Sequence, residues 1–322
     1  MILPIVAIIV GFFLLIKSAD KFVEGASSVA HHSGMPPLLI GMLVVGFGTS
    51  APEMVVSAMA AIDGNPALAL GNAIGSNIVN ISLILGVTAV LAPIAVHSNI
   101  VRKELPILLL ISLALGVMLW DFEISTVEAI VLLGIFFSVF GWQIYAGLTG
   151  KGDALEADCE ADVDPIDTSL SKSILMLTLG LIVLVASSRL LVWGAVEIAA
   201  ALGVSDLIIG LTIVALGTSL PELAASITAV RKGEHDLAIG NVVGSNMFNT
   251  LAVIGIAGAI QPISNIGAEI FWRDWIVMIV LTVLLLLMSI KIRKSRTINR
   301  YEGGALLLTY VGYNAYLISS SF

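Results

Sequence analysis

The chain has 322 residues, of which 58% are hydrophobic and only 12% are charged, and its formal net charge is −8. Soluble domains are about a quarter charged, so this composition excludes an ordinary soluble protein and predicts a polytopic membrane protein. The net charge says little about partners because seven of the acids lie in one loop. The single Cys159 excludes an internal disulfide and offers no cysteine-based metal site.

Ten apolar segments are predicted to cross the membrane as helices, since a span needs about 20 mostly apolar residues. They are residues 2–30, 37–62, 68–92, 105–120, 125–148, 173–200, 207–230, 237–260, 275–290 and 303–320. The first has neither a basic leader nor a small-residue cleavage site, so we expect a retained helix instead of a signal peptide.

A polar motif that contains proline occurs twice in the chain. Gly-Thr-Ser-Ala-Pro-Glu at residues 48–53 returns 169 residues later as Gly-Thr-Ser-Leu-Pro-Glu at 217–222. Each copy precedes a second motif, Gly-Asn-x-x-Gly-Ser-Asn-x-x-Asn, at 71–80 and 240–249. Aligned without a gap, residues 48–94 and 217–263 share 19 identities in 47 positions. An all-α fold of two five-helix repeats is therefore predicted, and an odd number of crossings makes the repeats inverted.

This repeat divides the chain into three parts: a first five-helix repeat (1–149), an acidic cytoplasmic linker (150–172) and a second, inverted repeat (173–322). The linker is expected to be solvated, with cation sensing as the less favoured alternative. If both termini are outside, the inner loops hold eleven basic residues and the outer loops hold only Arg273. The eleven are Arg102, Lys103, Lys151, Lys172, Arg231, Lys232, Lys291, Arg293, Lys294, Arg296 and Arg300. Because basic residues stay in the cytoplasm, the acidic linker and Cys159 are predicted to be inside.

Pro52 and Pro221 are each expected to break a helix at mid-depth, because proline removes a backbone donor and clashes with the preceding turn. The freed carbonyls would be those of Gly46 or Thr49 in the first repeat, and of Ala215 or Thr218 in the second. Unpaired carbonyls at membrane depth are tolerated where they line a cavity or bind a ligand.

Glu53 and Glu222 are the central candidates for function, since a carboxylate at the bilayer centre costs about 2.5–3.5 kcal/mol even on the lenient insertion scale. No basic residue is near either Glu along the chain, so protons or metal ions from solution are expected to neutralise them. Arg189, on the segment 173–200, is instead expected to snorkel or pair locally near the inner interface.

Helical spacing places Thr49 and Ser50 on the face of Glu53, and Ser76 with Asn80 on one face of the next helix. The second repeat supplies Thr218, Ser219, Glu222, Ser245 and Asn249 in the same way. Oxygen ligands of this kind suit hard cations, and a flexible cage suits Ca²⁺ and Na⁺ better than Mg²⁺.

At these two motifs the chain resembles the prokaryotic sodium/calcium exchangers of the cation/calcium antiporter superfamily. The resemblance covers the whole chain and implies Ca²⁺ and Na⁺ competing beside the two Glu, while the first and sixth helices slide. It implies a ligand set of Gly46 (carbonyl), Thr49, Ser50, Glu53, Ser76, Asn80, Ala215 (carbonyl), Thr218, Ser219, Glu222, Ser245 and Asn249. Several relatives, including the potassium-dependent branch, carry Asp at the position of Asn249, so potassium co-transport is not expected here.

The predicted function is therefore a secondary antiporter that exchanges Na⁺ for Ca²⁺ across the cytoplasmic membrane. Proton-coupled exchange is the main alternative, and a cation channel is less favoured because it would not need an inverted repeat. An enzyme is not expected, because no base accompanies Ser50 and no nucleophile is paired. We expect no cofactor, no nucleic acid and no obligate protein partner, only the transported ions and the lipid bilayer.

Overall fold

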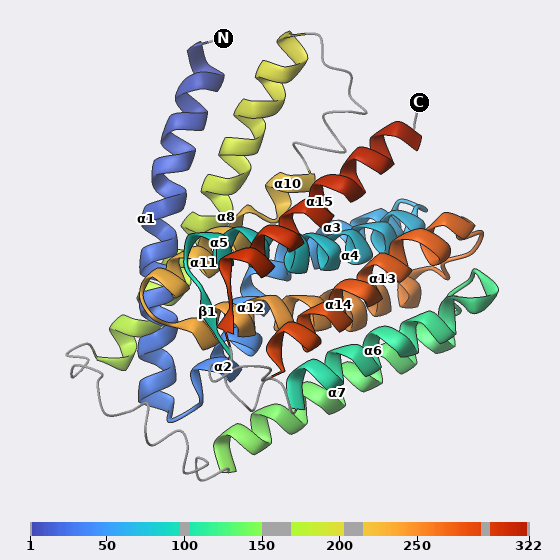
Figure 1. The fold of residues 1–322 in the computed structure, drawn as a ribbon, viewed down its shortest axis with the longest axis horizontal. Coiled ribbons are helices and arrows are strands. Elements are labelled where there is room, and N and C mark those ends of the chain that lie inside the picture. The colour runs from blue at the N-terminus through green and yellow to red at the C-terminus, as the bar shows by residue number, and fades with distance from the viewer. Residues whose placement is uncertain (1, 97–102, 150–168, 203–214, 291–296, 321–322) are drawn as a thin grey trace.

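The structure is a computed structural model that describes residues 2–96, 103–149, 169–202, 215–290 and 297–320. Within these ranges the chain is almost entirely helical (Figure 1). Seven helices are long and apolar enough to cross a membrane, and each of the ten predicted segments is helical over most of its described residues. Most of the acidic linker, including Cys159, lies outside the described residues, as does the first part of segment 207–230.

The first half contains α1 (Ile2–Ser33), α2 (Pro37–Ile40), η1 (Gly41–Gly46), α3 (Phe47–Ile62), α4 (Pro66–Val79), η2 (Asn80–Leu85), α5 (Gly86–Leu91), β1 (Ile94–Ala95), α6 (Leu105–Met118), η4 (Leu119–Asp121) and α7 (Thr126–Thr149). The second half contains α8 (Leu170–Ala201), α10 (Ala215–Thr218), α11 (Leu220–Arg231), α12 (His235–Phe248), η7 (Asn249–Val253), α13 (Ile254–Ile260), η8 (Ile270–Trp275), α14 (Ile276–Ser289), β2 (Thr297–Ile298) and α15 (Arg300–Ser320). The strands β1 and β2 pair antiparallel, with Ile94 opposite Ile298.

Helix boundaries recur at the same offset of 169 as the sequence motifs. Helix α4 and helix α12 begin and end at equivalent positions, and each continues into a π-helical turn, η2 or η7. The turns before α4 and α12 contain Gly64 and Gly233, whose φ angles are 84° and 81°. Glycine tolerates this left-handed conformation at no steric cost, so the same residue ends the preceding helix in both halves.

Helices α1 and α8 pack closely and antiparallel along one side of the molecule (Figure 1). Their contacts run in opposite directions, with Gly11 against Leu191 and Gly25 against Leu177. A Cβ atom added at Gly25 would lie 2.5 Å from the Leu177 backbone nitrogen. Gly180 of α8 is the repeat equivalent of Gly11, and a Cβ atom added there would lie 2.7 Å from the Phe22 backbone nitrogen. Glycine therefore lets the two backbones touch, as in close membrane helix pairs.

The two proline motifs differ in backbone structure. In the second half α10 ends at Thr218, Ser219 leaves the helical region with φ −91° and ψ 4°, and α11 begins at Leu220. The predicted break is confirmed there. In the first half the prediction is wrong, because α3 continues through Pro52 and a π-helix, η1, directly precedes it. Local π-helical turns and hydroxyl side chains can compensate a proline within a membrane helix.

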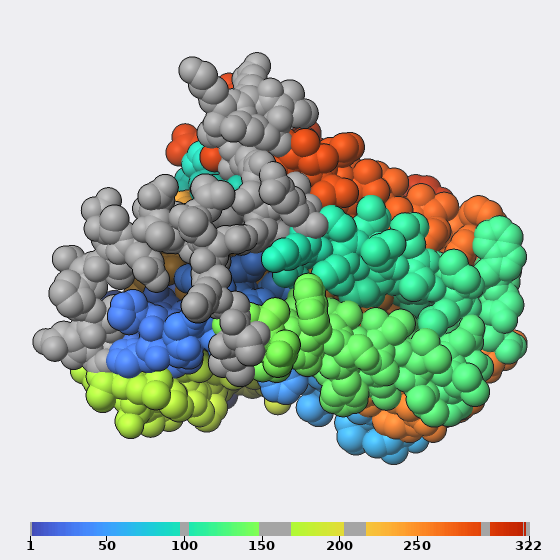
Figure 2. All heavy atoms as spheres, turned by 90° about the horizontal axis from the view of Figure 1, so that it is seen from below, coloured from blue at the N-terminus to red at the C-terminus, as the bar shows by residue number. Residues whose placement is uncertain are grey.

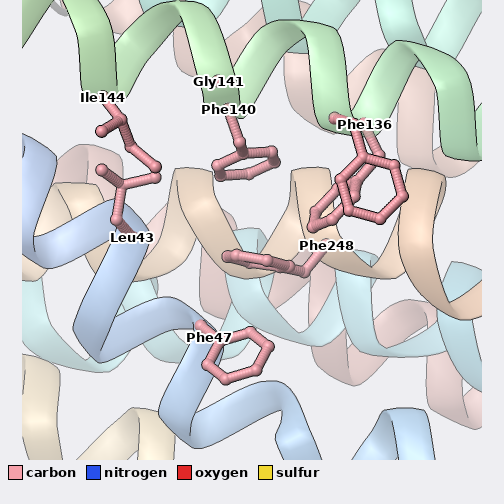
Figure 3. A pocket seen from close by; sticks show the side chains of 8 residues that line it. Leu43, Phe47, Phe136, Phe140, Gly141, Ile144 and Phe248 are labelled. Carbon is pink, nitrogen blue, oxygen red and sulfur yellow. The ribbon is translucent and has the colours of Figure 1, made fainter.

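An apolar pocket of about 300 Å³ lies where α7 meets the ends of η1 and α12. Phe136 and Phe140 of α7 point toward Phe248, and the rings of Phe140 and Phe248 stack with centroids 4.5 Å apart (Figure 3). Figure 2 shows α7 lying beside α6 on one face of the molecule. Because Phe248 and Phe47 directly precede Asn249 and Gly48, this aromatic contact packs against the back of both polar motifs.

Candidate ion-binding site

The polar residues of the two repeated motifs are buried inside the helical core. Glu53 on α3 is 3% exposed and Glu222 on α11 is 2% exposed. The other buried candidates are Thr49, Ser50, Ser76, Asn80, Ser219, Ser245 and Asn249. Thr218 is half-buried, and Ala215 belongs to the helical turn α10. Polar side chains of this kind are rarely placed in a core without partners, so their arrangement carries functional information.

The two repeats meet at the carboxylates. Glu53 and Glu222 are close enough for their charges to interact, and the hydroxyl of Thr49 donates to Asn241 Oδ1 across the repeat boundary at 3.1 Å. Ser245 of α12 reaches the opposite way, with its Oγ 3.5 Å from the carbonyl oxygen of Gly46. Both halves thus contribute oxygen atoms to one buried volume.

Several oxygens in this volume have no hydrogen-bond donor among the described residues. They are Ser50 Oγ, one carboxylate oxygen each of Glu53 and Glu222, and Asn249 Oδ1. An unsatisfied buried polar group costs about 1–3 kcal/mol, so four together need an explanation. Carboxylate, hydroxyl and amide oxygens are the types of ligand that Ca²⁺ and Na⁺ prefer.

Two asparagine side chains of the second motif, which were not predicted as ligands, support the site through hydrogen bonds. Asn241 donates to the Glu222 carbonyl at 3.2 Å and to the Ser226 hydroxyl at 3.0 Å. Its equivalent in the first repeat, Asn72, donates to Ser57 at 3.3 Å. Both the Asn and the Ser recur at the offset of 169, and this repetition could have indicated the supporting hydrogen bonds from the sequence.

A second set of amide contacts ties the repeats together directly. Asn80 Nδ2 lies 2.9 Å from Asn246 Oδ1, and Asn77 Nδ2 lies 2.8 Å from Thr250 Oγ1. Of the predicted ligands, Ser76 and Ser219 are buried nearby, but within the described ranges no hydrogen bond joins either to a carboxylate. Their assignment rests on position within the motifs.

The expectation that the carboxylates lack a basic neighbour is wrong. A pocket of about 340 Å³ is lined by Glu53, Asn72 and Thr218 on one side and by Ser188 and Arg189 of α8 on the other. The charge of Arg189 acts on the Glu53 carboxylate. Arg189 therefore lines the pocket beside Glu53, although its own side chain is exposed. Spacing along the chain could not reveal this contact, because α8 reaches the site only through tertiary packing.

Comparison with known proteins agrees with these features. Residues 3–145 and 172–319 match the family described as "Sodium/calcium exchanger protein". The chain is 47% identical over 321 residues to the "Putative antiporter CaxA" of Alkalimonas amylolytica, covering 99% of this chain and 100% of that one. It is 40% identical to the "Inner membrane protein YrbG" of Escherichia coli, covering 89% of each.

Solved structures show the same fold. The sodium-calcium exchanger NCX_Mj superposes with a TM-score of 0.84 at 32% identity, covering 98% of this chain and 99% of that chain. The "Sodium/calcium exchanger MaX1" of Methanosarcina acetivorans is 30% identical over 95% of this chain and 96% of its own length. These relatives are transporters and not enzymes. The chain is a multi-pass membrane protein that belongs to the sodium/calcium exchanger family.

Proposed function

We propose that this protein is a secondary antiporter that exchanges Na⁺ for Ca²⁺ by alternating access. The observation that carries the proposal is the pair of buried carboxylates, Glu53 and Glu222, contributed by equivalent motifs and surrounded by oxygens that have no donor. Two carboxylates are neutralised by one Ca²⁺ or by several Na⁺. The two ions therefore compete for one set of ligands, which is the physical requirement for exchange.

The proposed ligand set follows the repeat. It comprises Gly46 (carbonyl), Thr49, Ser50, Glu53, Ser76 and Asn80 from the first half, with Ala215 (carbonyl), Thr218, Ser219, Glu222, Ser245 and Asn249 from the second. The neutral oxygens are present twice over, and protonated carboxyls alone would not need them. This surplus favours Na⁺ over H⁺ as the coupling ion, because each Na⁺ needs its own ligands around shared carboxylates.

We also propose a chain of ten spans in two inverted repeats, with both termini outside and the linker in the cytoplasm, as the distribution of basic residues predicts. Helix α1 and its repeat mate α8 run antiparallel, as inversion requires. The pocket beside Glu53 extends along α8 from Val185 to Val196, toward the end of α8 that lies beside the start of α1. In the proposed orientation this is the outer face, so access in this state is from outside. Sliding of α1 and α8 across the other helices would move the opening to the inside.

Ion flux in proteoliposomes tests the proposal. Vesicles loaded with radioactive Ca²⁺ are diluted at fixed pH into Na⁺, with choline as the control. Na⁺-dependent, saturable efflux is the expected result. Efflux that ignores Na⁺ and follows an imposed pH gradient would establish the proton-coupled alternative, and efflux that needs no counter-ion would establish a channel.

A further inference from the structure

Arg189 is the one arginine that lies within a candidate span of the described chain and shares a pocket with a site carboxylate. Placing a guanidinium at membrane depth costs about 2.5–3.5 kcal/mol on the insertion scale, so a charge there is a functional residue by default. The pocket's remaining walls include Val56, Val185, Val192 and Trp193. The side chain of Arg189 is itself exposed, so water screens its charge, and the apolar walls strengthen its effect only where they exclude that water.

Packing fixes the position of Arg189 relative to the ion site. The neighbouring Ser188 donates its hydroxyl to the Gly217 carbonyl at 2.9 Å, which joins α8 to the helix break that precedes Glu222. On the opposite side α8 is held against α1 by the close approach at Gly180. The position of Arg189 relative to the site therefore depends on the position of α8, the helix proposed to slide.

Arg189 acts across the pocket and does not occupy the ligand positions. Its charge acts on the Glu53 carboxylate, yet among the described residues the two side chains form no direct ion pair. One Glu53 oxygen also remains without a hydrogen-bond donor. An arginine in this position leaves the carboxylate free for an incoming ion while adding a fixed positive charge beside it.

We propose that Arg189 lowers the affinity of the site for the cations that it binds. A fixed positive charge repels each bound cation in proportion to that cation's charge, so the penalty is twice as large for Ca²⁺ as for one Na⁺. Because several Na⁺ replace one Ca²⁺ in the proposed exchange, their summed charge is repelled at least as strongly, and Arg189 therefore weakens the binding of both substrates. This inference rests on the proposed exchange function, because it concerns the affinities of the same site.

The positive charge at Arg189 is specific to the second half of the chain. At the offset of 169 the counterpart of Arg189 is Asp20 on α1, an acid instead of a base. The polar residues of the motifs are identical at the equivalent positions, including both Glu and all three Asn. The asymmetry therefore lies on the sliding helices and not in the ligands.

Equilibrium binding of radioactive Ca²⁺ to purified protein in nanodiscs, with and without competing Na⁺, tests the inference. Arg189→Gln is expected to tighten binding of both ions, with the factor for Ca²⁺ equal to the square of the factor for one Na⁺. A threefold gain for Na⁺ would thus accompany about a ninefold gain for Ca²⁺. Arg189→Lys keeps the charge and is expected to remain near wild type.

The control is Glu197→Gln, which changes a charge on the same helix but does not line this pocket. Its Ca²⁺ affinity is expected to match wild type. If wild-type protein binds Ca²⁺ competitively with Na⁺ and Arg189→Gln binds no more tightly, the inference is overturned while the exchange function stands. An equal shift in Arg189→Lys and Arg189→Gln would assign the residue a packing role and also overturn it. Wild-type protein whose Ca²⁺ binding ignores Na⁺ would instead refute the proposed function.

Discussion

Glu53 and Glu222 lie close together in the core although their charges repel. The surrounding contacts explain how the arrangement is maintained: Thr49 donates to the side chain of Asn241, which in turn donates to the backbone carbonyl of Glu222. These contacts hold the backbone at Glu222 but do not neutralise the carboxylates. In the proposed exchanger the remaining charge is available to cations, which would make this pair of carboxylates the energetic centre of transport.

Glu53→Gln and Glu222→Gln are each expected to abolish Ca²⁺ transport while the protein still inserts and folds. The amide removes the ion's negative partner, and losing a charge at membrane depth lowers the cost of insertion by up to about 2.5–3.5 kcal/mol. Ca²⁺ flux in proteoliposomes and elution by size exclusion measure the two outcomes. Glu123→Gln, at an exposed residue before α7, is the matched control. Wild-type flux in either site variant would remove that residue from the site.

Ser76→Ala and Ser245→Ala are expected to raise the Na⁺ concentration for half-maximal exchange several-fold, with a smaller change in Ca²⁺ affinity. A neutral hydroxyl supplies a larger share of the binding energy of a monovalent ion than of Ca²⁺, for which the carboxylates supply most of it. Na⁺ titration of Ca²⁺ efflux measures the effect. Ser138→Ala, whose hydroxyl donates to its own helix at Gly134, is the control. A larger loss of Ca²⁺ affinity than of Na⁺ affinity would refute this division of roles.

The close packing of α1 against α8 depends on glycine residues in both helices. At Gly25 the nearest atoms to an added Cβ are backbone atoms of Leu177, which cannot rotate away as a side chain could. Since this pair is proposed to slide as a unit, its contact must be tight along its length. Glycine supplies that tightness in both helices at equivalent positions.

Gly25→Ala is expected to destabilise the protein by about 1–3 kcal/mol, the usual cost of overpacking, and to slow exchange. Thermal unfolding in detergent and the initial rate of Ca²⁺ flux are the measurements. Gly134→Ala on α7, where an added Cβ meets nothing within 4 Å, is the control and should leave both unchanged or slightly improved. Equal effects at the two positions would refute the close-packing argument.

Several elements were predictable because their ends carry local signals. Pro66 at the start of α4 and Gly64 in the preceding turn mark that boundary in the sequence itself. The π-helical turns, such as Gly41–Gly46, were not predicted. A π turn leaves no distinctive spacing of apolar residues, and it appears only when the whole helix adjusts to its neighbours. The continuity of α3 through Pro52 escaped prediction for the same reason.

At the scale of the molecule, the carboxylates and their oxygen-rich surroundings were predictable because they repeat, whereas Arg189 was not. Its counterpart is Asp20, so the repeat gave no signal for it. Nor does any spacing along α8 connect it with Glu53, which belongs to another repeat. A contact that forms only through tertiary packing, and that has no counterpart in the other repeat, can be recognised only in the structure.

The orientation of the whole chain is also testable. The excess of basic residues in alternate loops predicts that Cys159 is cytoplasmic. A membrane-impermeant thiol reagent is expected to leave intact cells unlabelled and to label Cys159 only after permeabilisation. The control is Glu123→Cys in a Cys159→Ala background, since Glu123 is exposed at the end predicted to be outside. The opposite labelling pattern would invert the topology.

Arg189 and Asp20 occupy equivalent positions in the two repeats, so the two access states of the proposed exchanger would differ in energy. In the state described here a base lies beside Glu53. At the equivalent position of the first repeat, α1 carries an acid instead. In the proposed exchanger, an ion-free carrier would therefore favour the state in which the arginine offsets the empty site. A transporter with such a resting side works as a rectifier: it reloads faster from one compartment than from the other, even when the ion gradients are equal and opposite.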